Sequence, residues 1–138
     1  MSDTMFSTLA VSSAGMRAQS ERVRVISQNI ANSDTSPEKP GEDPYRRQLI
    51  TFKSQLDKNL GAEVVKVKNV TEDQKSDFRI KYMPGHPAAD ADGYVKMPNV
   101  NSLVETMDMR EATRSYEANM GMFTQSRDMM NRTIDLLR

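Results

Sequence analysis

The chain has 138 residues, enough for one modest domain, and its 19 basic residues balance 19 acidic ones. The resulting net charge of zero gives no basic excess of the kind that indicates nucleic acid or an anionic membrane as a partner. Cysteine is absent, which excludes disulfides, thiolate metal sites and cysteine nucleophiles, and the mean hydropathy of −0.67 indicates a small core or apolar surface reserved for other subunits.

The first segment, from about Ser2 to Asn32, is predicted to be one long helix. It contains no proline, and apolar residues recur at every seventh position, which is typical of a helix that packs along another helix. The residues of this seam are Leu9, Met16, Val23 and Ile30. The helix would extend about 45 Å. An apolar seam this narrow does not stabilise a helix by itself, so a partner helix is needed.

The second segment, from about Ser33 to Val100, is predicted to be a loop followed by a small antiparallel β-module. Prolines and turn-forming Asp and Gly residues end the first helix. Short strands are expected at Glu63–Val70, Asp77–Met83 and Tyr94–Met97, where apolar residues cluster or alternate with polar ones. A long turn at residues 84–93 separates the last two.

The third segment, from about Asn101 to Arg138, is predicted to be a second long helix. Ser102 and Glu105 fit a capping box at its start. Its sevenfold seam consists of Met109, Tyr116, Phe123, Met130 and Leu137. Small or polar residues follow three positions later and would let a partner helix approach closely: Ala112, Asn119, Ser126 and Thr133.

The predicted fold is therefore mainly α: an antiparallel hairpin of long N- and C-terminal helices with a small antiparallel β insertion between them. Residues 1–32 plus 101–138 would form a terminal helical coiled-coil domain, and residues 33–100 a loop and small β-module. The 11 methionines and other apolar side chains exceed what one partner helix can cover. Such leftover apolar surface is typical of an assembly subunit.

The sequence predicts no catalytic residue, metal site or cofactor, because it has no Gly-rich phosphate loop, nucleophile elbow or Cys/His cluster. His86 lies near Asp90 and Asp92, which would be the basis of any metal or acid–base site. One histidine with loop carboxylates is too few ligands for a closed zinc site, and the glutamate of a calcium loop is missing. A turn that bonds its own backbone is the favoured interpretation.

Four stretches resemble the flagellar axial proteins, the family of rod and hook subunits. Val25–Thr35 resembles the motif that ends their first helix, and residues 45–47 with Phe52 resemble the segment after the first loop of the proximal rod proteins. Residues 84–101, PGHPAADADGYVKMPNVN, are similar to the hallmark of one family of proximal rod proteins, and residues 111–119 match the C-terminal helix motif. The resemblance covers the chain from end to end.

The resemblance implies a structural subunit of the proximal rod of the bacterial flagellar basal body. Such a subunit would assemble with other rod proteins and with copies of itself into the drive shaft that transmits torque from motor to hook. It would pass through the flagellar type III export apparatus without a cleaved signal peptide, and would lie in the rod within the periplasm, next to the membrane ring. Neither nucleic acid nor a small-molecule substrate is expected.

The resemblance also places the subunit-interaction motif on particular residues. These are Gln28, Asn29, Ile30, Ala31, Asn32, Asp34, Thr35, Tyr45, Arg46, Arg47, Gly85, His86, Pro87, Asp90, Gly93, Tyr94, Pro98, Asn99, Val100, Asn101, Arg114, Tyr116 and Asn119.

Plainer roles compete with this one: helix termination for the asparagines near residue 30, solvated or intersubunit ion pairs for the arginine pair, and core packing for Tyr116. At the level of function the alternatives are another flagellar axial protein of the rod, or a non-flagellar coiled-coil adaptor.

Overall fold

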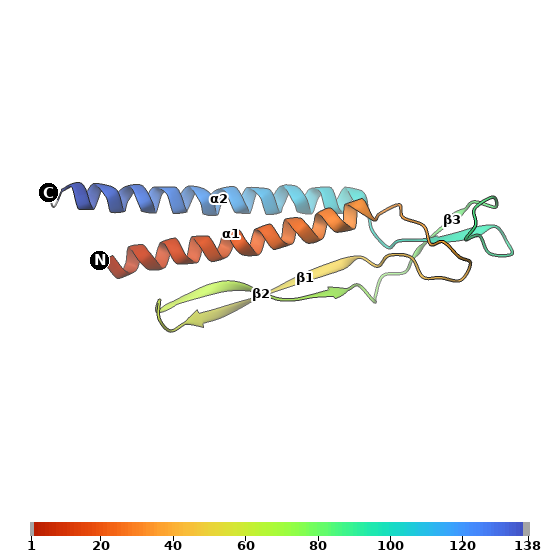
Figure 1. Cartoon of the computed structure of the whole chain (residues 1–138), viewed down its shortest axis with the longest axis horizontal. Coiled ribbons are helices and arrows are strands. Elements are labelled where there is room, and N and C mark those ends of the chain that lie inside the picture. The colour runs from red at the N-terminus through yellow and green to blue at the C-terminus, as the bar shows by residue number, and fades with distance from the viewer. Residues whose placement is uncertain (1, 137–138) are drawn as a thin grey trace. The chain divides into compact units, whose positions relative to one another are not determined.

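The computed structural model describes residues 2–136, which form two helices and four strands (Figure 1). Helix α1 spans Ser2–Ala31 and helix α2 spans Ser102–Asp135. Between them lie β1 (Gln48–Asp57), β2 (Ala62–Glu72), β3 (Arg79–Tyr82) and β4 (Tyr94–Met97). The expected mainly α chain with long helices at both ends is confirmed. Within residues 2–136, no helix is both long enough and apolar enough to cross a membrane.

The strands form two separate two-stranded sheets, β1–β2 and β3–β4, so the expected single β-module is in fact two hairpins. β1 was not predicted, because its alternation is weak: Ile50 and Phe52 share a face with Ser54, while Leu49 lies on the other face. A turn at residues 58–61 joins β1 to β2, and Gly61 takes the positive φ of 59° that such a turn favours.

The chain divides into two compact units, and each contains parts of both helices. The first unit combines the described residues of Met1–Val23, Ile50–Asn69 and Arg110–Arg138. The second combines Arg24–Leu49 with Val70–Met109.

In the first unit, the two helices approach closely at Gly15. A Cβ atom at this glycine would lie 2.8 Å from Oδ1 of Asn119 on α2. Ala112 and Ser126, which belong to the same sevenfold row as Asn119, are buried. The predicted seam residues are less buried: Phe123 and Met130 are half-buried and Tyr116 is exposed. Asn119 is half-buried and Thr133 is exposed, so the small and polar row is the most deeply buried face of α2 only from Ala112 to Ser126.

The other residues of the two predicted seams are half-buried wherever the structure describes them. Leu9, Met16, Val23, Ile30 and Met109 are half-buried, and Leu137 lies outside the described residues.

In the second unit, β3 and β4 pair antiparallel, with Arg79 opposite Met97 and Tyr82 opposite Tyr94. The apolar core beneath them contains Ala88, Val95 and Met97. The hairpin depends on Gly93, which has φ of 83° and whose missing Cβ would lie 2.9 Å from the ring of Tyr82.

The predicted capping box at the start of α2 is wrong. Asn101 is the cap, because its Oδ1 accepts the backbone N–H groups of Leu103 (3.0 Å) and Val104 (3.4 Å). Glu105 does not turn back to the helix start. Its carboxylate is buried and bonds to residues far away in the sequence.

Candidate functional site

The second unit holds a cluster of buried and half-buried polar side chains, hereafter the Asn29 cluster, made of Asn29, Tyr45, Arg47, Asn99 and Glu105. Asn29 comes from the last turns of α1 and Glu105 from the first turn of α2, and the side chain of each is only 1% exposed. Polar groups so deeply buried are costly unless they are hydrogen-bonded. The partners of each group therefore decide what the cluster does.

Asn29 uses its full hydrogen-bonding capacity. Its Oδ1 accepts from the hydroxyl of Tyr45 and from the backbone N–H of Gln48, both at 2.9 Å. Its Nδ2 donates to the backbone carbonyl of Gln48 at 2.9 Å and to Oε2 of Glu105 at 3.0 Å. One amide side chain thus joins the end of α1, the start of β1 and the start of α2.

Arg47 supplies the positive charge of the cluster. Its Nε donates to Oε1 of Glu105, and its guanidinium also reaches Asp108 at 3.4 Å. The arginine side chain is 25% exposed, whereas the carboxylate of Glu105 is buried. The charge of Glu105 is therefore compensated by one charged and one neutral donor, as a buried carboxylate requires.

Asn99 extends the cluster to the segment that follows β2. Its Oδ1 accepts the backbone N–H of Arg47 at 2.7 Å, while its Nδ2 donates to the carbonyls of Asp73 and Ser76, both at 3.2 Å. The carbonyl of Arg47 in turn accepts the N–H of Asp73 at 2.8 Å. The guanidinium of Arg46 donates to the same Asp73 carbonyl and lies 4.2 Å above the ring of Phe78.

Two groups here have shifted pKa values. Burial raises the pKa of Tyr45, and the negative charges of Glu105 and Glu72 raise it further. Hydrogen bonds from the Ser76 hydroxyl (2.6 Å) and from the N–H of Lys75 (2.9 Å) lower the pKa of Asp73 below its ordinary value. The tyrosine is therefore held neutral as a donor, and the aspartate is held charged as a turn cap.

Arg79 makes a second bridge within the same unit. Its guanidinium donates to the carbonyls of Ser33 at 2.7 Å and Pro98 at 3.0 Å, and lies 3.6 Å from the carboxylate of Asp34. This arginine fixes the chain just after α1 against the segment that leads into α2.

His86 and Asp90 serve the turn between β3 and β4. The Nδ1 of His86 accepts the N–H of Ala88 at 3.1 Å, and Nε2 lies 3.0 Å from the hydroxyl of Ser36. Oδ1 of Asp90 accepts the N–H groups of Asp92 at 3.1 Å and Tyr94 at 2.8 Å. Asp90 and Nδ1 of His86 bond the backbone of their own turn, as the turn interpretation expects, whereas Nε2 of His86 reaches the loop that follows α1.

The other residues of the expected motif lie around this site. Val100 and Pro98 are buried, Ile30 is half-buried, and Asn32 donates to the carbonyl of Gln28 at 2.8 Å where α1 ends. Exposed members are Gln28, Ala31, Asp34, Thr35, Gly85, Pro87, Tyr94 and Asn101. In the first unit, Arg114 and Tyr116 are exposed, and Asn119 donates to the carbonyl of Ser115 at 2.9 Å.

The structure thus brings Asn29, Tyr45, Arg47 and Asn99 together, although they are up to 70 positions apart. Sequence reasoning missed Glu105 as their anionic partner. A signal for it existed, since Glu105 precedes Ala112 by seven positions and so begins the buried row of α2. Asp73 and Arg79 were also missed, because their partners are mostly backbone atoms.

The Asn29 cluster offers positioning rather than chemistry. It contains no nucleophile paired with a base, and its charged groups are engaged in ion pairs and hydrogen bonds. Among the described residues, no group of three or more His, Cys, Asp or Glu side chains could hold a metal ion. What the arrangement does is hold the ends of two helices and the start of a strand in one geometry.

Comparisons with known proteins agree on one family. Residues 9–36 match the family described as flagella basal body rod protein, and residues 91–136 match the C-terminal region of the flagellar basal body rod FlgEFG proteins. The flagellar basal-body rod protein FlgC of Agrobacterium fabrum is 49% identical over 136 residues, covering 99% of this chain and 97% of its own length. FlgC of Bacillus subtilis is 38% identical, covering 96% and 98%. At this identity over nearly the whole chain, the protein belongs to the FlgC family of flagellar basal-body rod proteins.

Proposed function

We propose that this chain occupies the proximal part of the rod and assembles there, with other rod proteins and with copies of itself, into the shaft that carries torque from motor to hook. The chain is a structural subunit of the flagellar basal-body rod and not an enzyme. The observation that carries this conclusion is its similarity, from end to end, to FlgC proteins of several bacteria. The position in the proximal part of the rod and the transmission of torque go beyond that similarity and are the proposed part.

The two helices are proposed to form an antiparallel hairpin, the helical domain of residues 1–32 plus 101–138. Two contacts of the first unit support this arrangement. Gly15 lies against Asn119, and Arg22 lies 3.6 Å from Glu111. Moving seven residues forward on α1 corresponds to moving eight residues back on α2, which is the register of antiparallel helices.

The Asn29 cluster supports a mechanical role for the same chain. A shaft transmits torque only if its subunits resist deformation. In the second unit, charge-assisted and amide hydrogen bonds hold the end of α1 and the start of α2 to the same short segment before β1. Because the bond between Asn29 and Glu105 is buried and the other two are partly buried, water competes little with them.

The motif residues divide into two proposed roles. Those bonded within the chain, such as the buried Asn29 and the half-buried Asn99, position the backbone, while exposed ones, such as Gln28, Thr35 and Tyr116, contact neighbouring subunits. The membrane ring and the type III export apparatus are proposed partners, and the periplasm is the proposed location. These follow the family rather than any contact within the chain.

The test is electron cryotomography of basal bodies in a host strain that lacks this gene. We expect the export gate and membrane ring to remain while the rod and everything distal to it are missing, and re-expression of the chain to restore both. Normal rods and filaments in the deletion strain would contradict the proposal. Loss of only distal structures would instead indicate a different position along the rod.

A further inference from the structure

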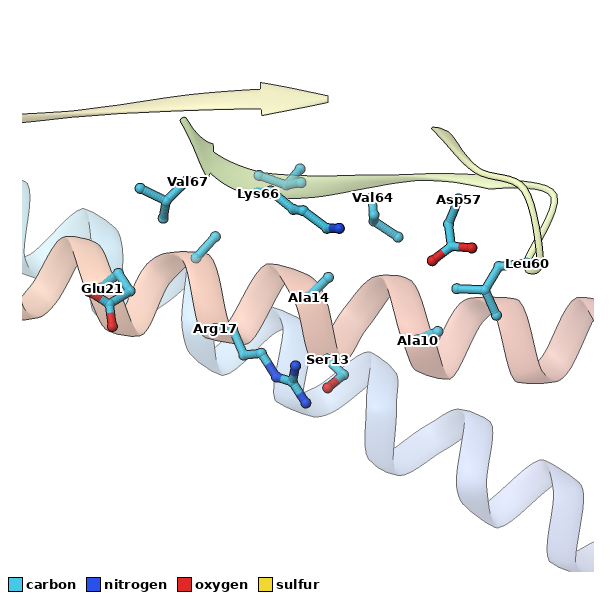
Figure 2. A pocket seen from close by; sticks show the side chains of 12 residues that line it. Ala10, Ser13, Ala14, Arg17, Glu21, Asp57, Leu60, Val64, Lys66 and Val67 are labelled. Carbon is cyan, nitrogen blue, oxygen red and sulfur yellow. The ribbon is translucent and has the colours of Figure 1, made fainter. Parts of the chain in front are cut away.

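The first unit contains a groove of about 490 Å³ between α1 and β2 (Figure 2). Its helical wall is made of small residues, Ala10, Ala14 and Ala18, one turn apart on α1. Its other wall includes Val64 and Val67 of β2. Ala18 and Val64 are buried at its floor, whereas Ala10, Ala14 and Val67 are half-buried. Because alanine side chains end at Cβ, the helix leaves room beside Val67 for the side chains of another element.

Charged residues line the same groove in a definite order. Arg17 and Lys66, both exposed, lie along its middle. Asp57 lies at the end next to Ala10 (Figure 2). Glu21 lies at the opposite end, so the charges along the groove are acidic, basic and acidic in turn (Figure 2). A partner that extends from the Asp57 end to the middle would therefore carry a basic group followed by an acidic one.

The same unit exposes a stripe of α2 that carries this complementary order. The stripe surrounds a hollow over Gly121, where an added Cβ would meet no atom within 4 Å. Met120 and Met129 flank the hollow and are 45% and 48% exposed. Arg132 and Asp128, also in its lining, are separated by one helical turn, about 6 Å.

We propose that this α2 stripe of one copy docks in the α1–β2 groove of a second copy, with the two helices antiparallel. Asp128 would then lie against Arg17 and Lys66, and Arg132 would reach Asp57. The methionines would fill the space above the alanines, as flexible side chains do in irregular apolar gaps. The proposal rests on the rod function and deepens it by naming one contact between copies.

The polarity of the contact suits a shaft. If each subunit is an antiparallel hairpin and all subunits point the same way, α1 of one copy meets α2 of the next copy antiparallel. The groove and the stripe are different surfaces, so the contact is heterologous. A heterologous contact that does not close into a ring leaves one free groove and one free stripe at the two ends of the oligomer and can therefore continue along a helix.

The absence of cysteine allows a direct test by disulfide cross-linking in isolated basal bodies. One copy carries Ala14→Cys and a second, differently tagged copy carries Met129→Cys. The matched control replaces Met129→Cys by Asn131→Cys, an exposed site two residues away on the opposite face of α2. We expect about tenfold more cross-linked heterodimer with Met129→Cys than with the control, because only that pair brings the two Cα atoms within bonding range.

The outcomes separate this proposal from the rod function. Rods that contain both tagged copies but give no heterodimer, or equal amounts with Asn131→Cys, would overturn the contact while leaving the function intact. If basal bodies isolated from the wild-type strain did not contain this chain, the rod function itself would be refuted. If the cysteine variants do not assemble, charge reversal decides: Arg17→Asp and Asp128→Arg should each reduce the number of rods per cell, and their combination should restore it. Failure of the combination to restore rods would overturn the contact.

Discussion

The guanidinium of Arg47 donates to the carboxylate of Glu105 across 58 positions of sequence, and that carboxylate is 1% exposed. The same guanidinium also meets Asp108, whose side chain is 34% exposed. One arginine thus pairs with a buried and with a half-exposed carboxylate. Because both carboxylates share the same cation, comparing them shows how much burial adds to the contribution of an ion pair to the free energy of unfolding.

Glu105→Gln should destabilise the chain much more than Asp108→Asn. The first change leaves Arg47 facing a neutral group and should lower the free energy of unfolding by about 1–3 kcal/mol. The second removes a solvent-screened pair and should cost less than about 1 kcal/mol. Urea unfolding of the purified chain, followed by the circular dichroism of tyrosine, measures both values. Equal effects would mean that the burial of Glu105 carries no energetic weight.

Asn29→Asp should disrupt the second unit although the two side chains have nearly the same shape. The new carboxylate would replace both donated hydrogen bonds of Asn29 by repulsion from the Gln48 carbonyl and from Glu105. We expect a loss of about 2–4 kcal/mol. Because burial disfavours the charged form of the new Asp, the loss should shrink as the pH falls.

Asn32→Asp is the control for this substitution. Asn32 donates only to the carbonyl of Gln28 near the solvent-exposed end of α1, so its change should cost much less. Thermal unfolding at pH 5 and pH 8 distinguishes the two variants. A pH-independent effect of Asn29→Asp would count against repulsion as the cause.

The Asp73 turn should stabilise the chain at neutral pH and lose this effect in acid. Its pKa in the folded state is lower than the ordinary value of 3.8, chiefly because of the hydrogen bond from Ser76. A lowered folded pKa gives stability that is present above the unfolded pKa and disappears as the pH falls through the folded pKa. Ser76→Ala should therefore differ from wild type at pH 7, and the difference should shrink below pH 3.8.

Ser54→Ala provides the matched control for that experiment. The Ser54 hydroxyl also donates to a carboxylate, that of Glu63, at 2.9 Å, but on an exposed strand surface. Its removal should have little effect on the unfolding midpoint at any pH. A difference between Ser76→Ala and wild type that persists at pH 2.5 would argue for a packing effect instead.

Gly15→Val should impair rod assembly, because the first unit has no space for a side chain at this position. The Cβ would lie 2.8 Å from Oδ1 and 2.9 Å from Cγ of Asn119. Asn119 is half-buried and bonded to its own helix, so it can give way only in part. The number of rods per cell, counted by cryotomography, should fall, and adding Asn119→Ala should partly restore it. No rescue would place the defect outside this contact.

The sequence predicted both helices because their signals are local: long stretches without proline and apolar residues at every seventh position. The turn of residues 84–93 was equally readable from its glycines and prolines. Glu105 was misread as a cap because its real partner, Arg47, is distant in the sequence and no local pattern reveals it. Strand β1 escaped notice because only two clear apolar residues mark its inner face.

The Asn29 cluster is a second case in which contacts between distant parts of the chain could not be predicted from the sequence. Resemblance to the axial proteins placed Asn29, Tyr45, Arg47 and Asn99 in contacts between subunits, and it gave no sign of the bonds that these residues make within the chain. The contacts found for these residues lie within one chain. A motif can be recognised from spacing alone, whereas the direction in which each side chain points depends on the tertiary fold.

The free chain should be ordered around the Asn29 cluster and disordered toward both termini. In the first unit, α2 buries mainly small and polar residues, so helix pairing there removes little apolar area from water and offsets little chain entropy. Hydrogen exchange of the monomer should therefore be fast for residues 5–20 and 115–135. The N–H groups of Arg47, Gln48 and Asp73, which donate within the cluster, should exchange slowly.

Assembly into the rod should slow hydrogen exchange in the two terminal segments. The helical segments should become protected in isolated rods, because contacts with neighbouring subunits supply the missing burial, so that folding and binding occur together. The cluster amides, already protected in the monomer, should change little and so serve as an internal reference. Uniformly slow exchange in both end segments of the free monomer would contradict this view. It would mean that the helices form a stable hairpin before they meet the rod.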